Sequence, residues 1–198
     1  MRILGLTGGS GTGKSTVAKL LAARGAGWVD ADAVYHSLCI SCTPMLEALA
    51  AAFGDVRRPD GALDRPALAK IVFSDPAQLR RLNGITHRYI REASQEAFAR
   101  LAAQGCPLAL YDAPTLLESG LNSLCDAGVL GVLAPFGVRV RRIMERDGLT
   151  EQAARARVGA QPPDAFYRAR CDYIIENSDG LEALRPLVDR FWASLPTG

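Results

Sequence analysis

The sequence has few lysines and histidines and no long apolar segment. Only three of its 23 basic residues are lysines, Lys14, Lys19 and Lys70, and arginine, which supplies the rest, can bind a phosphate with two donors at once. A net charge of only +2 argues against a nucleic-acid-binding protein, which carries a concentrated basic face. No run of about 18 uninterrupted apolar residues exists, so we expect no transmembrane helix. The first residues are too polar for a signal peptide, so we expect a cytoplasmic protein without a nucleic-acid or membrane partner.

The length and the composition indicate one globular domain. The chain has 198 residues, of which 48% are hydrophobic and 22% are charged, and a domain usually spans about 100–200 residues. The five cysteines are an odd number in a chain expected to be cytoplasmic, so we expect no disulfide framework. Cys39 and Cys42 form a C-x-x-C pair without a second pair at metal-binding spacing, and we interpret them as partly buried residues near a loop. Nothing in the sequence indicates the oligomeric state.

Short apolar runs alternate with longer helical patterns along the chain. We expect strands at residues 2–7, 27–30, 107–112, 128–134 and 171–176. Spacings of three and four predict helices at residues 15–24, 31–37, 44–53, 66–73, 78–101, 138–161 and 180–194. The sixth helix is interrupted at Gly148 and starts again at Thr150, and Pro186 predicts a kink or a later start in the last. Apolar strands separated by helices predict an α/β fold, with a five-stranded parallel sheet covered by helices on both sides.

We expect three parts within the single domain over residues 1–198. The nucleotide-binding core comprises residues 1–32, 105–137 and 171–198. About 75 residues separate the second and third predicted strands, too many for one crossover helix, so residues 33–104 are expected to form a helical lobe. The arginine-rich residues 138–165 are expected to form a lid.

The stretch GGSGTGKS at residues 8–15 carries the clearest chemistry, because it fits the pattern G-x-x-x-x-G-K-[ST]. A predicted strand precedes it and a predicted helix follows. Glycines let successive backbone N–H groups point at phosphate oxygens, and the helix N-terminus adds positive charge. The residues expected to bind the nucleotide phosphates are Gly8, Gly9, Ser10, Gly11, Thr12, Gly13, Lys14, Ser15 and Thr16. Lys14 would reach the outer phosphates, and the Ser15 hydroxyl would ligate magnesium.

Three acids follow predicted strands, where ligands of open α/β sheets bind. Asp32 is a candidate for accepting the proton of an attacking hydroxyl, and Asp30 for supporting the water shell of the metal. An acid here can equally cap the helix that begins near Ala31. Asp112 ends the third strand, where an acid orients magnesium, although a strand-end cap fits equally well.

Six arginines lie in the predicted lid: Arg139, Arg141, Arg142, Arg146, Arg155 and Arg157. Arg142 and Arg146 are four residues apart and share a helix face. Arginines on a mobile lid can close over ATP, exclude water and neutralise transferring charge. The alternative is a solvated basic face whose arginines pair with Glu145, Asp147 and Glu151.

These motifs favour a small kinase over other nucleotide-binding classes. A GTP-binding protein would usually show N-K-x-D for guanine, and none is present. A kinase of shikimate or nucleosides has a similar plan, and a catalytically silent nucleotide sensor remains an alternative. His36 and His87 lie too far apart in sequence and lack the acid or cysteine partners of a metal site.

Several segments in order resemble the dephospho-coenzyme A kinase family along nearly the whole chain. They are GLTGGSGTGKST (5–16), VDAD (29–32), DGALDR (60–65), IVFSDP (71–76), LNGITH (82–87), DAPTLLE (112–118), RIMERD (142–147) and DYIIEN (172–177). The resemblance implies a three-layer P-loop kinase fold with a helical substrate lobe and a lid. It also implies that ATP and magnesium are used to phosphorylate the ribose 3′-hydroxyl of dephospho-coenzyme A, giving coenzyme A and ADP.

The resemblance assigns roles to individual residues. Asp32 matches the acid regarded as the base at the substrate, and Lys14 matches the lysine of the ATP loop. Arg142 and Arg146 match lid arginines with a catalytic role, and His87 matches a histidine of the substrate lobe. The chain departs from the family's usual residues at Arg88, at residues 41–44, near Tyr167 and at Cys171.

Overall fold

The computed structural model describes residues 1–72 and 75–195. It contains two compact units, Met1–Trp28 together with Leu101–Gly198, and Val29–Arg100. All five cysteines are free, as expected. No single helix in the described part of the chain is long and apolar enough to cross a membrane. The helices Ala31–Ser41 and Thr43–Phe53 meet that criterion only as a pair, across a bend of 81°.

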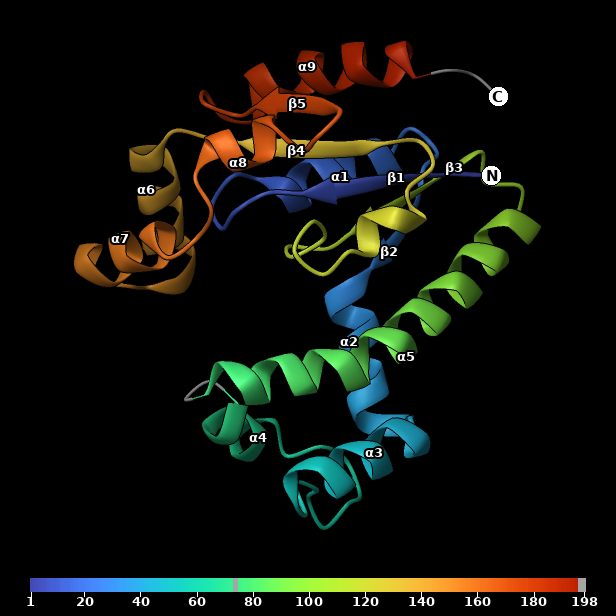
Figure 1. The fold of residues 1–198 in the computed structure, drawn as a ribbon. Helices are drawn as coiled ribbons and strands as arrows, with labels where there is room; N and C mark the ends of the chain where they lie inside the picture. The colour runs from blue at the N-terminus through green and yellow to red at the C-terminus, as the bar shows by residue number, and fades with distance from the viewer. Residues whose placement is uncertain (73–74, 196–198) are drawn as a thin grey trace. The chain divides into compact units, whose positions relative to one another are not determined.

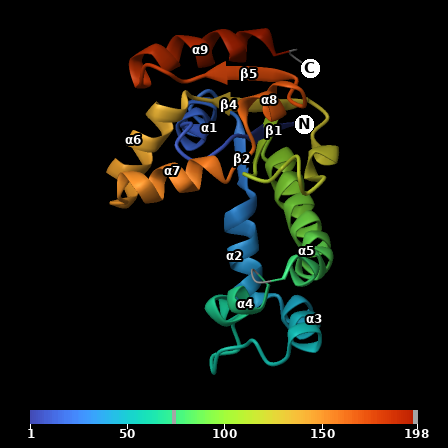
Figure 2. The same cartoon turned by 60° about the vertical axis from the view of Figure 1, so that its left-hand side comes forward.

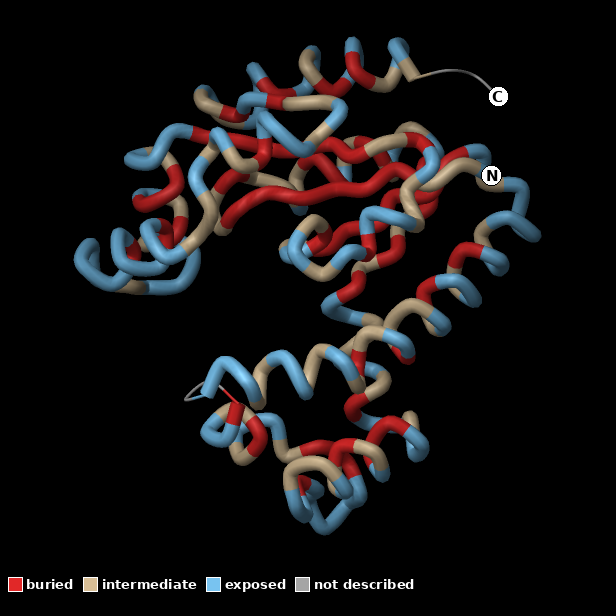
Figure 3. Tube along the Cα trace, viewed as in Figure 1, coloured by how far each residue is buried: buried red, intermediate tan, exposed pale blue. Residues whose placement is uncertain are grey.

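A five-stranded sheet lies mainly in the first unit, with the last two residues of β2 in the second (Figure 1). The strands are β1 (Arg2–Thr7), β2 (Gly27–Asp30), β3 (Leu108–Asp112), β4 (Val129–Leu133) and β5 (Tyr173–Glu176). Their order is β2-β3-β1-β4-β5, and β1 pairs in parallel with β3 and β4, as β4 does with β5. Every residue of β3 and β4 is buried (Figure 3), which explains why these strands are apolar on both faces. The predicted α/β sheet flanked by helices is confirmed.

Helices of the first unit pack on this sheet. The first and last helices, α1 (Lys14–Ala22) and α9 (Leu181–Ser194), contact each other. Both bury apolar residues in the main core. The short helix α8 (Asp164–Arg168) lies against β4, and the 3-10 turn η1 (Leu121–Leu124) lies against β1. Burial in this core holds β1 in the middle of the sheet, and β1 leads directly into the glycine-rich loop.

The helices α6 (Phe136–Asp147) and α7 (Glu151–Gly159) form a hairpin and lie side by side in both views (Figures 1 and 2). Gly148 ends α6 in the left-handed conformation, with φ at 65°. Thr150 caps α7 by accepting a hydrogen bond from the Ala153 amide at 3.3 Å. The predicted break and restart are therefore confirmed.

The second unit is helical. It comprises α2 (Ala31–Ser41), α3 (Thr43–Phe53), α4 (Arg65–Val72) and most of α5 (Pro76–Ala103). These helices share a core of their own, in which Met45 and Leu49 are fully buried. The residues between α3 and α4 make a turn closed by an antiparallel bridge between Arg57 and Leu63.

Some boundaries differ from the predicted ones. Strands β3, β4 and β5 begin one or two residues later than predicted, helix α2 runs four residues past 37, and α6 begins two residues before 138. Neither α8 nor η1 was predicted, because each is too short to show a periodic pattern. Pro186 lies inside α9 without delaying its start. Phe73, the predicted end of α4, and Ser74 of the IVFSDP segment lie outside the described residues.

Candidate nucleotide-binding site

The glycine-rich loop joins β1 to α1 at residues 8–13, and local hydrogen bonds close it. The carbonyl of Gly9 accepts from the Thr12 hydroxyl at 2.9 Å and from the Thr12 amide at 3.3 Å. The carbonyl of Gly13 accepts from the amides of Thr16 and Val17 at 2.9 and 3.1 Å. The amides of Lys14 and Ser15 therefore precede the first intrahelical bond of α1 and are available to an anion.

No other residue fits at the position of Gly13, at the start of α1. Its φ is 92°, in the left-handed region, and an added Cβ would lie 2.1 Å from Nδ2 of Asn177. Asn177 is buried, directly follows β5, and donates from Nδ2 to the Thr12 carbonyl at 2.8 Å. No individual role was predicted for Asn177, although its place at the carboxyl end of a strand is a signal that could have identified it.

Lys14 and Asp112 come together beside the loop. Asp112 is the last residue of β3, is only 3% exposed, and accepts a hydrogen bond from Nζ of Lys14 in an ion pair. The register brings it there, because Asp112 pairs with Leu6 near the end of β1.

The predicted magnesium ligands are both oxygen donors. The Ser15 hydroxyl lies on the exposed first turn of α1, and the Asp112 carboxylate is held by Lys14. The described residues contain no cluster of three or more histidine, cysteine or acidic side chains that could hold a metal on their own. Such a pair nevertheless fits magnesium, which is usually bound through one or two protein oxygens together with phosphates and waters.

Two arginines of α6 contact the phosphate-binding loop. Arg142 donates to the Gly11 carbonyl at 3.3 Å, and to the carbonyl and Oδ1 of Asn177 at 3.1 and 3.3 Å. Arg139 is 4% exposed and donates from Nε to the Ser10 carbonyl at 3.0 Å. Burial lowers the pKa of both guanidinium groups, yet both remain charged because arginine keeps its proton in proteins.

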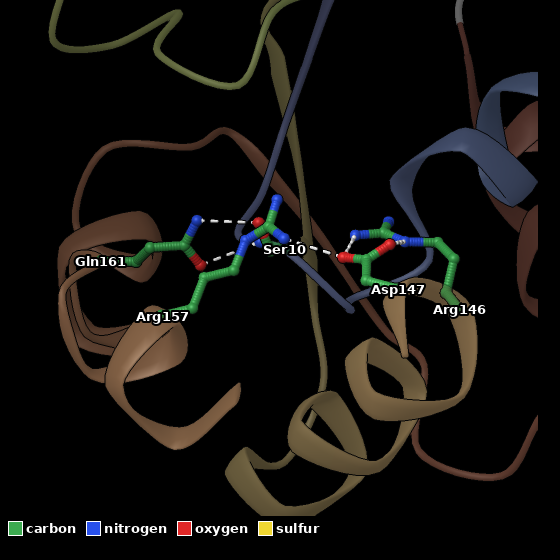
Figure 4. Close-up of polar contacts among 5 residues, drawn as sticks. All are labelled: Ser10, Arg146, Asp147, Arg157 and Gln161. Carbon is green, nitrogen blue, oxygen red and sulfur yellow. Dashed lines mark hydrogen bonds and ion pairs between the residues drawn. The ribbon is translucent and has the colours of Figure 1, made fainter. Parts of the chain in front are cut away.

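The other hydrogen-bonded arginines of the hairpin pair with acids. Asp147 accepts from Arg146 and from Arg157, each at 2.7 Å (Figure 4). Arg155 pairs with Glu151 at 2.8 Å along one face of α7. These contacts match the alternative to an ATP-binding lid, in which the arginines form a solvated face and pair with acids. Exposed ion pairs of this kind add little to stability. The catalytic role of Arg146 stays a prediction.

Gln161 also contacts the loop, although no sequence pattern predicted this. It follows the end of α7, and its side chain is hydrogen-bonded to Ser10 (Figure 4). A glutamine at a helix end carries no local pattern, so only the tertiary structure identifies this contact.

In the second unit, the two acids of the VDAD segment occupy different places. Oδ1 of Asp30 accepts from the amides of Asp32 and Ala33 at 2.9 and 3.1 Å, so Asp30 caps α2. Asp32 lies in the exposed first turn of α2. The cap on α2 therefore belongs to Asp30, and the role of Asp32 at the substrate stays a prediction.

His87 lies in α5 and is half-buried. Burial lowers its pKa below 6.5, and the guanidinium of Arg91 one turn away lowers it further. The lowered pKa favours the neutral form of His87 at pH 7. It is not part of a metal cluster among the described residues.

We expect Asn177→Ala to loosen the loop, because the buried Thr12 carbonyl loses its shortest hydrogen bond and Arg142 loses an acceptor. The free energy of unfolding should fall by about 1–2 kcal/mol, and ATP affinity should fall with it. Asn122→Ala, on the exposed side of η1, is the matched control. Urea unfolding and calorimetric ATP titration of both variants measure the effects. Equal losses in the two variants would contradict this role for Asn177.

We also expect His87 to make stability depend on pH. Its pKa is lowered in the folded protein, so below about pH 6.5 the unfolded chain binds more protons at this residue, and the free energy of unfolding falls as pH falls. His87→Gln should weaken that dependence, whereas His36→Gln, at an exposed position of α2, should not. Urea midpoints measured from pH 5 to pH 8 compare the three proteins. Identical pH profiles would rule the effect out.

The chain is similar to known proteins of one family. A family model described as dephospho-CoA kinase matches residues 2–183. The chain is 52% identical to dephospho-CoA kinase from Anaeromyxobacter dehalogenans, covering 100% of this chain and 94% of that protein. It is 42% identical to dephospho-CoA kinase from Leifsonia xyli, covering 98% and 99%.

Solved structures show the same fold. The crystal structure of TT1252 from Thermus thermophilus has a TM-score of 0.82 and 37% identity, covering 98% of both chains. Dephospho-CoA kinase from Campylobacter jejuni has a TM-score of 0.70 and 24% identity, covering 98% of this chain and 96% of that one. From the family match and the full-length relatives, the chain belongs to the dephospho-CoA kinase family.

Proposed function

We propose that the protein transfers the γ-phosphoryl group of ATP to the 3′-hydroxyl of the ribose of dephospho-CoA, giving CoA and ADP. The observation that carries this proposal is the match to the dephospho-CoA kinase family over residues 2–183. The glycine-rich loop agrees with it, because its free first-turn amides and Lys14 suit a triphosphate. The substrates are small molecules, and the proposal places the reaction in the cytoplasm, where ATP is supplied.

In this proposal the loop and Lys14 hold the phosphates of ATP. The amides at the start of α1 donate to phosphate oxygens, and Lys14 exchanges the carboxylate of Asp112 for the outer phosphates. Ser15 and Asp112 would hold magnesium, which would supply positive charge to neutralise the phosphates. Arg142 lies on the loop through Gly11 and would stabilise charge on the transferring group. Arg146 would join it from the same helix face.

Asp32 and His87 supply the acceptor side of the proposal. Asp32 would accept the proton of the ribose hydroxyl or hold that hydroxyl in line with the γ-phosphate. His87, whose neutral form is favoured at pH 7, can accept or donate one hydrogen bond to the substrate. Asp30 is engaged with the α2 amides, and the proposal therefore gives it no direct part in catalysis.

A panel of acceptors tests the proposed function. We expect ADP formation with dephospho-CoA and ATP, and none above background with shikimate or nucleosides. Phosphate on the ribose 3′-oxygen, identified by mass spectrometry and NMR of the product, completes the assignment. ADP formation with another acceptor only would favour a kinase of similar build. ATP binding without ADP formation on any acceptor would favour a nucleotide sensor.

Asp32→Asn tests the base. The change keeps the shape of the side chain and removes its charge, so we expect ATP binding to stay near intact while kcat falls at least ~10²-fold, as for a positioned base. Asp55→Asn is the control in the same unit, since Asp55 is an exposed acid paired with Arg57. Steady-state kinetics and ATP titration separate the two effects. A kcat close to that of the unmodified protein would refute the role of Asp32.

A further inference from the structure

Two side chains hold the backbone of Ser10 through the peptide groups before and after it. Its amide donates to Oε1 of Gln161 at 2.9 Å, and its carbonyl accepts from Nε of Arg139 at 3.0 Å. Nε2 of Gln161 donates to the Ser10 hydroxyl at 3.0 Å, and Nη2 of Arg139 donates to Oε1 of Gln161 at 2.5 Å. The three residues therefore form a closed ring of hydrogen bonds, of which Figure 4 shows the bonds between Gln161 and Ser10.

The two gripping residues come from opposite ends of the α6–α7 hairpin. Arg139 lies in the first turn of α6, and Gln161 lies two residues past the end of α7. Between them the helices share an apolar core of Val140, Ile143, Ala154 and Val158, all buried. The packed core joins the two helices, so the position of the hairpin and the backbone conformation at Ser10 are linked.

The ring also places a positive charge against the loop. Arg139 is 4% exposed, and its hydrogen bonds go to the neutral oxygens of Ser10 and Gln161. Its guanidinium lies directly against the backbone of Gly9, where an added Cβ would come within 2.3 Å of Nη2. The Asp164 carboxylate stabilises the charge of this guanidinium, whereas its hydrogen bonds go to neutral oxygens, so a phosphate at the loop would be a stronger acceptor.

We propose that Gln161 is a positioning residue for the phosphates of ATP: it fixes the Ser10 peptide and the Arg139 guanidinium, and so links the phosphate-binding loop to the α6–α7 hairpin. This inference rests on the proposed function and deepens it. Gln161 acts through Ser10 and Arg139, so its loss affects the nucleotide and leaves the acceptor untouched.

Gln161→Ala is the principal test. We expect the Kd for ATP in the presence of magnesium, measured by calorimetry without an acceptor, to rise about 10-fold, because three hydrogen bonds that orient the loop are lost. The KM for ATP should rise in parallel, and the KM for dephospho-CoA should not change. Gln152→Ala is the matched control, since Gln152 is an exposed glutamine in the first turn of α7, and it should leave both constants unchanged.

A double-mutant cycle tests whether Gln161 acts through Ser10. Ser10→Ala removes the hydroxyl that Gln161 bonds and leaves the peptide contact in place, so we expect a smaller loss of ATP affinity, about 2–3-fold. The double variant should bind ATP no more weakly than Gln161→Ala alone, because coupled residues give non-additive effects. Additive effects would overturn the proposal.

Hydrogen exchange tests the geometry directly, even where Gln161→Ala folds poorly. In the unmodified protein without ATP, the Ser10 amide should exchange slowly because Gln161 accepts its hydrogen bond. Fast exchange would overturn the proposal. So would unchanged ATP affinity in Gln161→Ala, whether or not its Tm falls, since a purely structural brace predicts that result. If the unmodified protein binds ATP but does not phosphorylate dephospho-CoA, the proposed function fails, whereas the ATP measurements still decide the role of Gln161.

Discussion

The hydrogen bond from Asn177 to the Thr12 carbonyl holds the phosphate-binding loop at the end of the sheet. It joins residues 165 positions apart in the chain, and Asn177 itself is fixed because its amide donates to Leu133 at the end of β4. Gly13 must lack a side chain to leave room for this contact. The loop thus takes its conformation from the sheet as well as from its own glycines, and α1 starts in a defined direction.

The loop and the strands were predictable because their signals are local. The pattern at residues 8–15 lies in one continuous segment, and the strand before it is apolar on both faces. The contacts that hold the loop were not predictable in the same way. Asn177 and Gln161 reach it through hydrogen bonds to residues 165 and 151 positions away, and only the packed sheet and hairpin bring these residues together.

The alternatives that the sequence left open are separated by geometry. Asp30 and Asp32 are the same residue type, so the sequence alone does not tell them apart. Only the residue directly before the first turn of α2 can accept hydrogen bonds from its first amides, and that residue is Asp30. Among the arginines, Arg139 and Arg142 extend to the loop, whereas Arg146 and Arg157 meet at Asp147. Helical periodicity gives the face of each arginine, but which partner each one reaches depends on where the hairpin lies against the loop.

The cations beside the loop share one property. Each one donates to an acceptor that is weaker than a phosphate, or to an acceptor that a phosphate can replace. Arg139 and Arg142 donate to neutral oxygens of Ser10, Gly11, Gln161 and Asn177. Lys14 pairs with the carboxylate of Asp112. Hydrogen bonds between ionised groups are roughly twice as strong as neutral ones, so a triphosphate can compete for these donors. The same contacts keep the loop in shape without closing it to its ligand, because carbonyl and amide oxygens are weaker acceptors for the arginines than a phosphate.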